Sequence, residues 1–226
     1  LFFSELLPSA PVCFDIGANH GEITATLLGL GARLVVAAEP QLELATFIEN
    51  NFTEAIVSKR LVVIPKAIGD QTGVAKFYPA QDINKCMSTL SSIFVEVSQH
   101  NGDRWDSPVD VDVITVDSLI KDFGIPDYIK IDVEGFDYNV LMGLSTAVSL
   151  LSFEYNTQMH LIDIAVDCIK RIASLGTYCF NYQTEAPNEI ALQLSTWVDA
   201  ETMIYMLKYD IGRKKVHGDI FAKRVI

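Results

Sequence analysis

The chain has 226 residues, of which 50% are hydrophobic and 20% are charged, and its formal net charge is −12. This length suits one domain with a sizeable core, so we expect a single domain over residues 1–226. The negative charge argues against nucleic acid as a partner, because such a surface repels phosphate backbones. No apolar run is long enough to cross a membrane.

Two further features bear on location. The cysteines at 13, 86, 168 and 179 have no CxxC spacing. This pattern predicts reduced, mostly buried thiols in a cytoplasmic protein rather than a zinc site. The first residues, LFFSELLPSAPV, are apolar but contain Glu5 and have no basic segment, so we do not expect a signal peptide.

Strand-like and helix-like segments alternate from the start of the chain. Short apolar runs predict strands at 11–17, 33–40 and 60–70, and helical spacing predicts helices over 20–30 and 41–52. The apolar residues that we expect to face the core from these two helices are Ile23, Leu27, Leu28, Leu30, Leu44, Phe47 and Ile48.

The alternation breaks after the third strand. An edge strand is expected at 73–80, and a long polar stretch follows over 81–109. Loops of this length inside a compact domain are usually functional. We expect 81–109 to be a lid or a substrate-binding insertion.

The alternation resumes in the second half. The segments predicted there begin with a strand that runs into a helix turn at 111–120. Strands at 126–135 and 148–156, helices at 136–147 and 160–175, a strand at 177–183, a helical stretch near 199–208 and a strand at 218–226 follow. Repeated strand–helix units imply an α/β protein with a mostly parallel sheet and helices on both faces. In such sheets, ligands bind beyond the carboxyl ends of the strands.

The first predicted strand ends in FDIGANHG, where Gly17 and Gly21 permit backbone angles that other residues avoid. The helix that follows directs its free N–H groups to the same place. We therefore interpret this turn as built for a ligand rather than for packing. The spacing is not GxGxxG, and Asp15 suits a cationic group such as the ammonium of an amino acid. The alternative is a tight turn in which Asp15 caps the helix.

The second predicted strand ends at Glu39, twenty-two residues after Gly17. An acid at this distance hydrogen-bonds ribose hydroxyls in dinucleotide-binding folds. The alternative is a solvated glutamate before Pro40. The residues after the third strand that would border an adenine are Lys66, Ala67 and Ile68.

Polar side chains also end the strand IKIDVEG. Side chains alternate along a strand, so Lys130, Asp132 and Glu134 share one face. Buried charges must be paired or used, and the alternative to a functional site is an internal salt bridge around Lys130. The next strand, SFEYN, places Glu154 and Asn156 on one face. If the two strands are neighbours, we expect a single site at their carboxyl ends that contains Asp132, Glu134, Glu154 and Asn156.

The segments FDIGANHGE, AAEP, AIGD, IKIDVEGFDYNVLMG, SFEYN and GDIFAKR together resemble the FkbM-type methyltransferases, from about residue 12 to residue 224. The resemblance implies a Rossmann-like class I methyltransferase fold, with a seven-stranded, mostly parallel sheet, helices on both faces and an antiparallel last strand. It implies S-adenosylmethionine as the cofactor, and a hydroxyl of a sugar, a lipid-linked molecule or a natural product as the methyl acceptor. The cofactor contacts that follow from the strand ends and the resemblance are Asp15, Gly17, Ala18, Asn19, Gly21, Glu39, Pro40, Ala67, Ile68 and Asp132.

Our primary hypothesis is methyl transfer to a hydroxyl, helped by alignment of the reactants and by a nearby base. The catalytic candidates are Asp132, Glu134, Glu154 and Lys130. His160 is a less favoured base, and we expect His20 to face solvent.

A variant of this mechanism adds Mg²⁺ or Ca²⁺, held by Asp132, Glu134, Glu154 and Asn156, to lower the pKa of the acceptor oxygen. Because Lys130 already supplies a positive charge, the expected site contains no metal.

Two other classes of function stay open. A nicotinamide-dependent oxidoreductase would share the ribose-binding Glu39, but GxGxxG is missing and Asp15 lies where a pyrophosphate would bind. A non-catalytic, cofactor-binding partner subunit would have no reason to keep buried carboxylates at two strand ends. The expected partner is a small-molecule acceptor, and apolar surface in 81–109 would equally suit a homo-oligomer.

Overall fold

The computed structural model describes residues 2–81, 87–99, 102–157, 161–184, 191–214 and 216–225. Its main feature is a seven-stranded sheet with the order β3-β2-β1-β7-β8-β10-β9. In that order, the strands are Leu61–Ile64, Leu34–Ala38, Val12–Ile16, Tyr128–Ile131, Leu150–Asn156, His217–Arg224 and Tyr178–Thr184. Only β10 among these seven runs against its neighbours, β8 and β9. The predicted mostly parallel sheet with an antiparallel last strand is confirmed.

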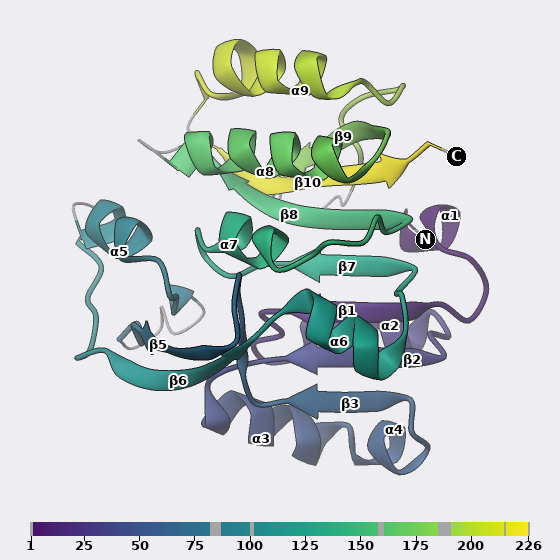
Figure 1. Cartoon of the computed structure of the whole chain (residues 1–226), viewed down its shortest axis with the longest axis vertical. Coiled ribbons are helices and arrows are strands. Elements are labelled where there is room, and N and C mark those ends of the chain that lie inside the picture. The colour runs from purple at the N-terminus through teal and green to yellow at the C-terminus, as the bar shows by residue number, and fades with distance from the viewer. Residues whose placement is uncertain are drawn as a thin grey trace.

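Helices cover both faces of this sheet (Figure 1). They are α1 (Phe2–Leu6), α2 (Glu22–Gly29), α3 (Leu42–Asn51), α4 (Thr53–Val57), α5 (Ser92–Gln99), α6 (Val116–Phe123), α7 (Asp137–Met142), α8 (Leu161–Leu175) and α9 (Ala200–Met206), the last continued by a π-helical turn, Leu207–Ile211. Along β1, Phe14 and Ile16 belong to one core cluster and Cys13 to the other. Because side chains alternate along a strand, a strand that is buried on both faces needs apolar residues at successive positions. This is why β1 could be predicted from the sequence.

Two residues that we expected to face the core are exposed. Leu30 follows the end of α2 and is 37% exposed, and Phe47 on α3 is 45% exposed. The inward stripe of α3 is instead Leu44, Ala45 and Ile48. The Phe47 ring packs edge-on against His20 at a centroid distance of 5.4 Å.

A second, three-stranded sheet was not expected. It has the order β4-β6-β5, with strands Ala67–Ile68, Val109–Ile114 and Gly73–Phe77. The strand predicted at 60–70 is split between the two sheets at Pro65, which has no N–H to donate to a ladder. The segment 111–120, predicted as a strand that runs into a helix turn, contains the end of β6 and the start of α6, but β6 pairs in the second sheet and not in the main one.

The polar stretch 81–109 contains a helix, α5, which the sequence analysis missed. Its buried residues include Phe94, Val95 and Val97. The second sheet and α5 lie beyond the carboxyl ends of the parallel strands, and both ends of the described chain lie on the opposite side (Figure 1). Cys86 lies outside the described residues, and the three described cysteines are free thiols.

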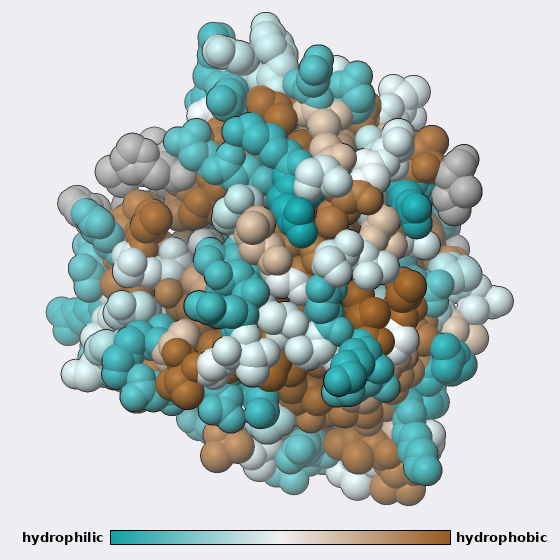
Figure 2. Space-filling view, viewed as in Figure 1, coloured by the Kyte–Doolittle hydropathy of each residue, from teal (hydrophilic) through white to brown (hydrophobic). Residues whose placement is uncertain are grey.

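The surface combines charged and apolar side chains. Hydrophobic residues are visible among hydrophilic ones in Figure 2, including an area toward the bottom, where α3 and α4 lie. Leu42 and Val57, on these two helices, are among the exposed large apolar residues. Within the described ranges, none of the helices has the length and apolar character needed to cross a membrane.

Candidate active site

A cavity of about 1070 Å³ lies at the carboxyl ends of β1, β2, β7 and β8, where β10 begins. This is the place where ligands bind in open α/β sheets. Its walls come from the main sheet, the second sheet and the segment before α5. The sequence-predicted residues among its lining are Gly17, Asn19, Glu39, Pro40, Lys66, Ala67, Ile68, Lys130, Asp132, Glu134, Glu154 and Asn156.

The two glycines of the first turn are required by packing. Gly17 and Gly21 have φ angles of 83° and 82°. A Cβ on Gly17 would lie 1.7 Å from the carbonyl oxygen of Asp132, and a Cβ on Gly21 would lie 2.9 Å from a ring carbon of Phe52. Neighbouring protein atoms therefore require both glycines, which the sequence analysis did not foresee, and the role of the turn in ligand binding stays a prediction. Gly17 also lines the cavity.

Asp15 is buried beneath this turn rather than exposed to the cavity. It is 1% exposed, and its carboxylate accepts a hydrogen bond of 2.6 Å from the Thr24 hydroxyl on α2. Burial raises the pKa of Asp15 to about 6, although Thr24 and Lys130 oppose the shift. Of the described cofactor candidates, Asp15, Ala18 and Gly21 do not line the cavity. Asp15 therefore contacts α2, and its side chain does not line the cavity.

Glu39, at the end of β2, is held by the backbone of two segments. Its carboxylate oxygens accept hydrogen bonds from the N–H of Asn19 at 3.0 Å and from the N–H of Gln41 at 2.8 Å. Burial raises the pKa of Glu39 above its ordinary value, and these two donors oppose the shift. Each oxygen keeps a further lone pair, so the carboxylate is positioned to accept hydroxyl donors from the cavity.

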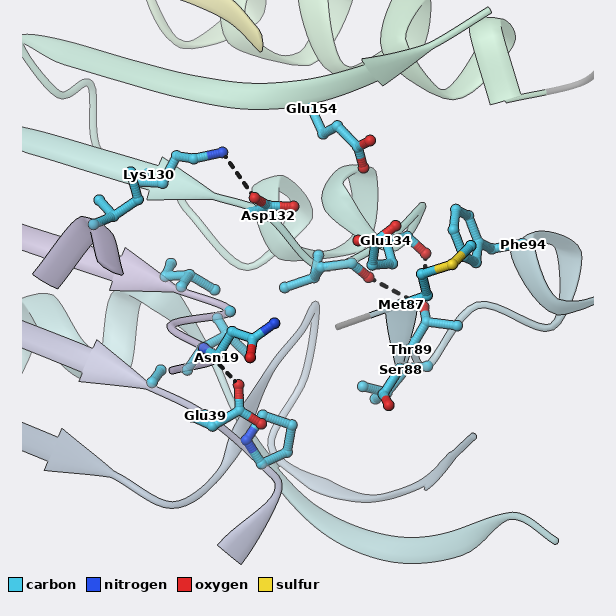
Figure 3. Close-up of a pocket in the computed structure, with 18 of the residues that line it drawn as sticks. Asn19, Glu39, Met87, Ser88, Thr89, Phe94, Lys130, Asp132, Glu134 and Glu154 are labelled. Carbon is cyan, nitrogen blue, oxygen red and sulfur yellow. Dashed lines mark hydrogen bonds and ion pairs between the residues drawn. The ribbon is translucent and has the colours of Figure 1, made fainter. Parts of the chain in front are cut away.

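Asn19 supplies an unused acceptor at the same place. It has a positive φ of 48°, and among the described residues its Oδ1 finds no hydrogen-bond partner although the atom is buried. Figure 3 shows the Asn19 side chain beside Glu39 on one side of the cavity. A buried acceptor without a partner costs free energy unless a ligand or water donates to it.

Lys130 lines the cavity and belongs to a network of ion pairs. Its Nζ atom lies 3.1 Å from Asp132 Oδ2 and 2.7 Å from Asp219 Oδ1, and Gln183 donates to the other Asp219 oxygen at 2.6 Å. Burial acts to lower the pKa of Lys130, but the Asp132 and Asp219 carboxylates outweigh it and hold that pKa well above its ordinary value. The internal salt bridge that we weighed as an alternative is therefore present, and it forms part of the cavity.

Three carboxylates face one another on the opposite side of the cavity from Glu39 (Figure 3). One oxygen from each of Asp132, Glu134 and Glu154 lies within 4.8 Å of the others. β7 and β8 are parallel neighbours, which is why the two strand ends meet as expected. Burial, followed by repulsion from Glu134 and Asp132, raises the pKa of Glu154 well above its ordinary value.

Glu134 is not on the strand, contrary to the sequence-based assignment. β7 ends at Ile131, and Glu134 takes a positive φ of 55° in the turn that follows. The Thr89 hydroxyl lies 2.7 Å from the carbonyl oxygen of Glu134 and 3.1 Å from that of Val133. A Cβ on Gly135 would lie 3.1 Å from Phe94. The segment before α5 thus fixes the turn that carries Glu134.

The sequence analysis missed several residues of this site. Asp219 on β10 and Gln183 on β9 line the cavity. Asp137, a carboxylate at the start of α7 that is 2% exposed, lines a small second cavity together with Glu154. The signal for Asp219 was available, since it is an acid at the start of the apolar strand GDIF. His20 is exposed, as expected, and His160 lies outside the described residues.

The family model described as "Methyltransferase FkbM domain" matches residues 15–167. The chain belongs to the FkbM methyltransferase family. Its methyl donor is S-adenosylmethionine, as the resemblance implied. This membership favours methyl transfer over the nicotinamide-dependent alternative. In sequence, the chain matches no curated protein.

Solved structures share the fold of this FkbM methyltransferase. The crystal structure of a methyltransferase FkbM from Methylobacillus flagellatus KT has a TM-score of 0.56 and 21% identity, over 84% of this chain and 45% of that one. The M1A22 tRNA methyltransferase TrmK of B. subtilis has a TM-score of 0.51 and 13% identity, over 99% of this chain and 64% of that one. The chain therefore spans less than two thirds of the length of either protein, and the likeness shows the fold alone.

The cavity fits S-adenosylmethionine chemically. The buried, partnerless Asn19 Oδ1 and the Glu39 carboxylate are acceptors that suit the ammonium and hydroxyl donors of that molecule. The apolar side chains of Pro40, Ala67 and Ile68 line the same side.

Proposed function

We propose that the protein transfers the methyl group of S-adenosylmethionine to a hydroxyl oxygen of a small polyhydroxylated acceptor, such as a sugar, a lipid-linked molecule or a natural product, in the cytoplasm. One observation carries the proposal. The same cavity is lined by the Glu39 carboxylate on one side and by the cluster of Asp132, Glu134 and Glu154 on the other.

In this proposal, the cofactor occupies the side of the cavity formed by β1, β2 and β4. Glu39 accepts hydrogen bonds from the ribose hydroxyls, and Pro40, Ala67 and Ile68 border the adenine. Gly17 and Asn19 contact the amino-acid part, while Asp15, Ala18 and Gly21 shape the turn from behind. Asp132, in the cluster on the other side, would border the cofactor as well.

The acceptor occupies the side near β7 and β8. The bound cofactor supplies an electrophilic methyl group, so the protein's main task is to align the acceptor oxygen with it, which is worth about 7–11 kcal/mol at best. Glu154 is our first candidate to take the hydroxyl proton, because its carboxylate lies in the cluster on the acceptor side. Lys130 holds Asp132 in place, and Asp132 and Glu134 orient the acceptor.

The 81–109 stretch would form the outer wall of the acceptor side. Met87, Ser88, Thr89, Leu90 and Phe94 line the cavity there. We propose that this segment selects the acceptor, within a single domain. A net charge of −12 disfavours a nucleic-acid acceptor, and the exposed apolar side chains of α3 and α4 would suit a homo-oligomer.

The test is a transfer assay with methyl-labelled S-adenosylmethionine and paired acceptors. Each hydroxylated sugar is compared with its amino analogue, and tRNA is included. The proposal predicts label on hydroxyl oxygen and none on tRNA. Label found only on amines or on tRNA would contradict it. Glu154→Gln should lower turnover while affinity for S-adenosylhomocysteine stays the same, and Glu49→Gln, an exposed change on α3, serves as the matched control.

A further inference from the structure

The carboxylates of Asp132, Glu134 and Glu154 are arranged as a set of cation ligands. Their oxygens lie within 4.8 Å of one another. A Ca²⁺ ion binds oxygen at about 2.3–2.6 Å, and Mg²⁺ at about 2.0–2.1 Å. Oxygens on opposite sides of a bound Ca²⁺ are therefore separated by about twice the first distance. The cluster already has this size, and a smaller ion would require only a slight contraction.

The three carboxylates of the cluster lie close enough to repel one another. Lys130 is the nearby cation, and Asp219 shares it with Asp132. Lys130 contacts Asp132 through Oδ2. Glu154 lies beside two further carboxylates, and like charges at this separation are unfavourable without a cation or a proton between them.

A separate observation also indicates a ligand at this place. Asp137 is 2% exposed, and its Oδ1 has no hydrogen-bond partner among the described residues. Asp137 and Glu154 line the same small cavity of about 10 Å³, next to Asn156. That volume is close to what one water molecule needs. A water held by a cation at Glu154 would donate to the Asp137 oxygen, and Mg²⁺ in particular keeps several of its waters.

We propose that Asp132, Glu134 and Glu154 bind one divalent cation of the Mg²⁺, Mn²⁺ or Ca²⁺ type, with Asp137 holding a water of that cation. The cation would hold the acceptor oxygen beside the cofactor, a role that rests on the methyl-transfer function proposed above. The proposal revises the expectation of a metal-free site. The lysine that was expected to replace a metal is used by Asp132 and Asp219.

The test measures metal binding without catalysis. Mn²⁺ is titrated into chelator-treated protein, and the free ion is followed by its electron paramagnetic resonance signal. The variants are Glu154→Gln, Glu134→Gln and Asp137→Asn, with Glu49→Gln as the control for the loss of one charge. S-adenosylhomocysteine is titrated calorimetrically into the same samples, which shows that each variant is folded.

The proposal predicts one Mn²⁺ per chain that Ca²⁺ or Mg²⁺ displaces. Glu154→Gln and Glu134→Gln should weaken binding at least tenfold, and Asp137→Asn should weaken it about 10–100-fold, as loss of an outer-shell partner does. Glu49→Gln should leave it unchanged.

Two results would overturn the cation site. The wild type could bind no Mn²⁺ while it binds S-adenosylhomocysteine, or Glu49→Gln could weaken Mn²⁺ binding as much as Glu154→Gln does. In both cases the methyl-transfer proposal would stand. Failure of the folded wild type to bind S-adenosylhomocysteine would instead overturn the proposed function.

Discussion

Replacement of Glu39 by alanine tests the cofactor side of the cavity. The change removes the two oxygens that accept the N–H groups of Asn19 and Gln41, and with them the free lone pairs that face the cavity. Hydrogen bonds to a charged acceptor contribute about 1.5–3 kcal/mol, so affinity for S-adenosylhomocysteine should fall about 10–100-fold.

The change should also lower the free energy of unfolding slightly. The two N–H groups lose their partner, at a cost of about 1–3 kcal/mol each if they stay dry. Water from the open cavity offsets part of this cost, and removal of a buried carboxylate with a raised pKa offsets more. For a chain of this size, each kcal/mol corresponds to about 2–4 °C in melting temperature.

The assay is calorimetric titration of S-adenosylhomocysteine into the wild type, Glu39→Ala, Glu39→Gln and Glu49→Ala. The glutamine variant keeps one acceptor oxygen but turns an NH₂ group toward the second backbone N–H, so it should bind with intermediate affinity. Glu49→Ala removes one exposed charge on α3 and should bind like the wild type. Unchanged affinity in a folded Glu39→Ala variant would mean that the ribose lies elsewhere and that our assignment of the strand ends is wrong.

Three further predictions concern the residues around the cavity. In Asp15→Asn, the free energy of unfolding should match that of the wild type near pH 4 and exceed it above pH 6 by about 2–3 kcal/mol. The reason is that folding raises the pKa of Asp15 to about 6, and an acid with a raised pKa destabilises the folded state as pH increases. Thermal melts across pH measure this, and a difference between variant and wild type that shrinks as pH rises would contradict it. Thr89→Val removes the hydroxyl donor to the Glu134 turn, so it should cost about 1 kcal/mol and slow methyl transfer without weakening S-adenosylhomocysteine binding, and unchanged turnover would refute this positioning role. Lys130→Met leaves Asp219 without its ammonium partner, so it should lower the free energy of unfolding by about 3–5 kcal/mol. Denaturant titrations measure this loss, and a loss below about 1 kcal/mol would show that the Lys130–Asp219 ion pair contributes little.

The carboxyl ends of the strands could be predicted from the sequence for a physical reason. Parallel strands buried on both faces form short apolar runs, and a polar residue that closes such a run marks the edge of the sheet. Glu39 and Asp132 follow this pattern directly after β2 and β7, and Glu154 lies near the end of β8. The cavity includes all three, and Asp132 and Glu154 meet because β7 and β8 are neighbours.

The rest of the site depends on contacts between distant parts of the chain. Asp219 reaches Lys130 because β10 runs antiparallel beside β8, and Thr89 reaches the Glu134 turn from a stretch that looked like a polar loop. Local periodicity carries no information on either pairing. The packing requirement at Gly17 could not be predicted for a related reason, since the atom that excludes a side chain there belongs to Asp132, more than a hundred residues later.

A crystal structure with S-adenosylhomocysteine bound tests the central claim most directly, because it places both sides of the cavity at once. The account predicts ribose hydroxyls within about 2.7–3.2 Å of the Glu39 carboxylate. It also predicts that the sulfur atom faces the cluster of Asp132, Glu134 and Glu154. A bound molecule with its ribose away from Glu39, or with its sulfur turned from the carboxylates, would contradict it.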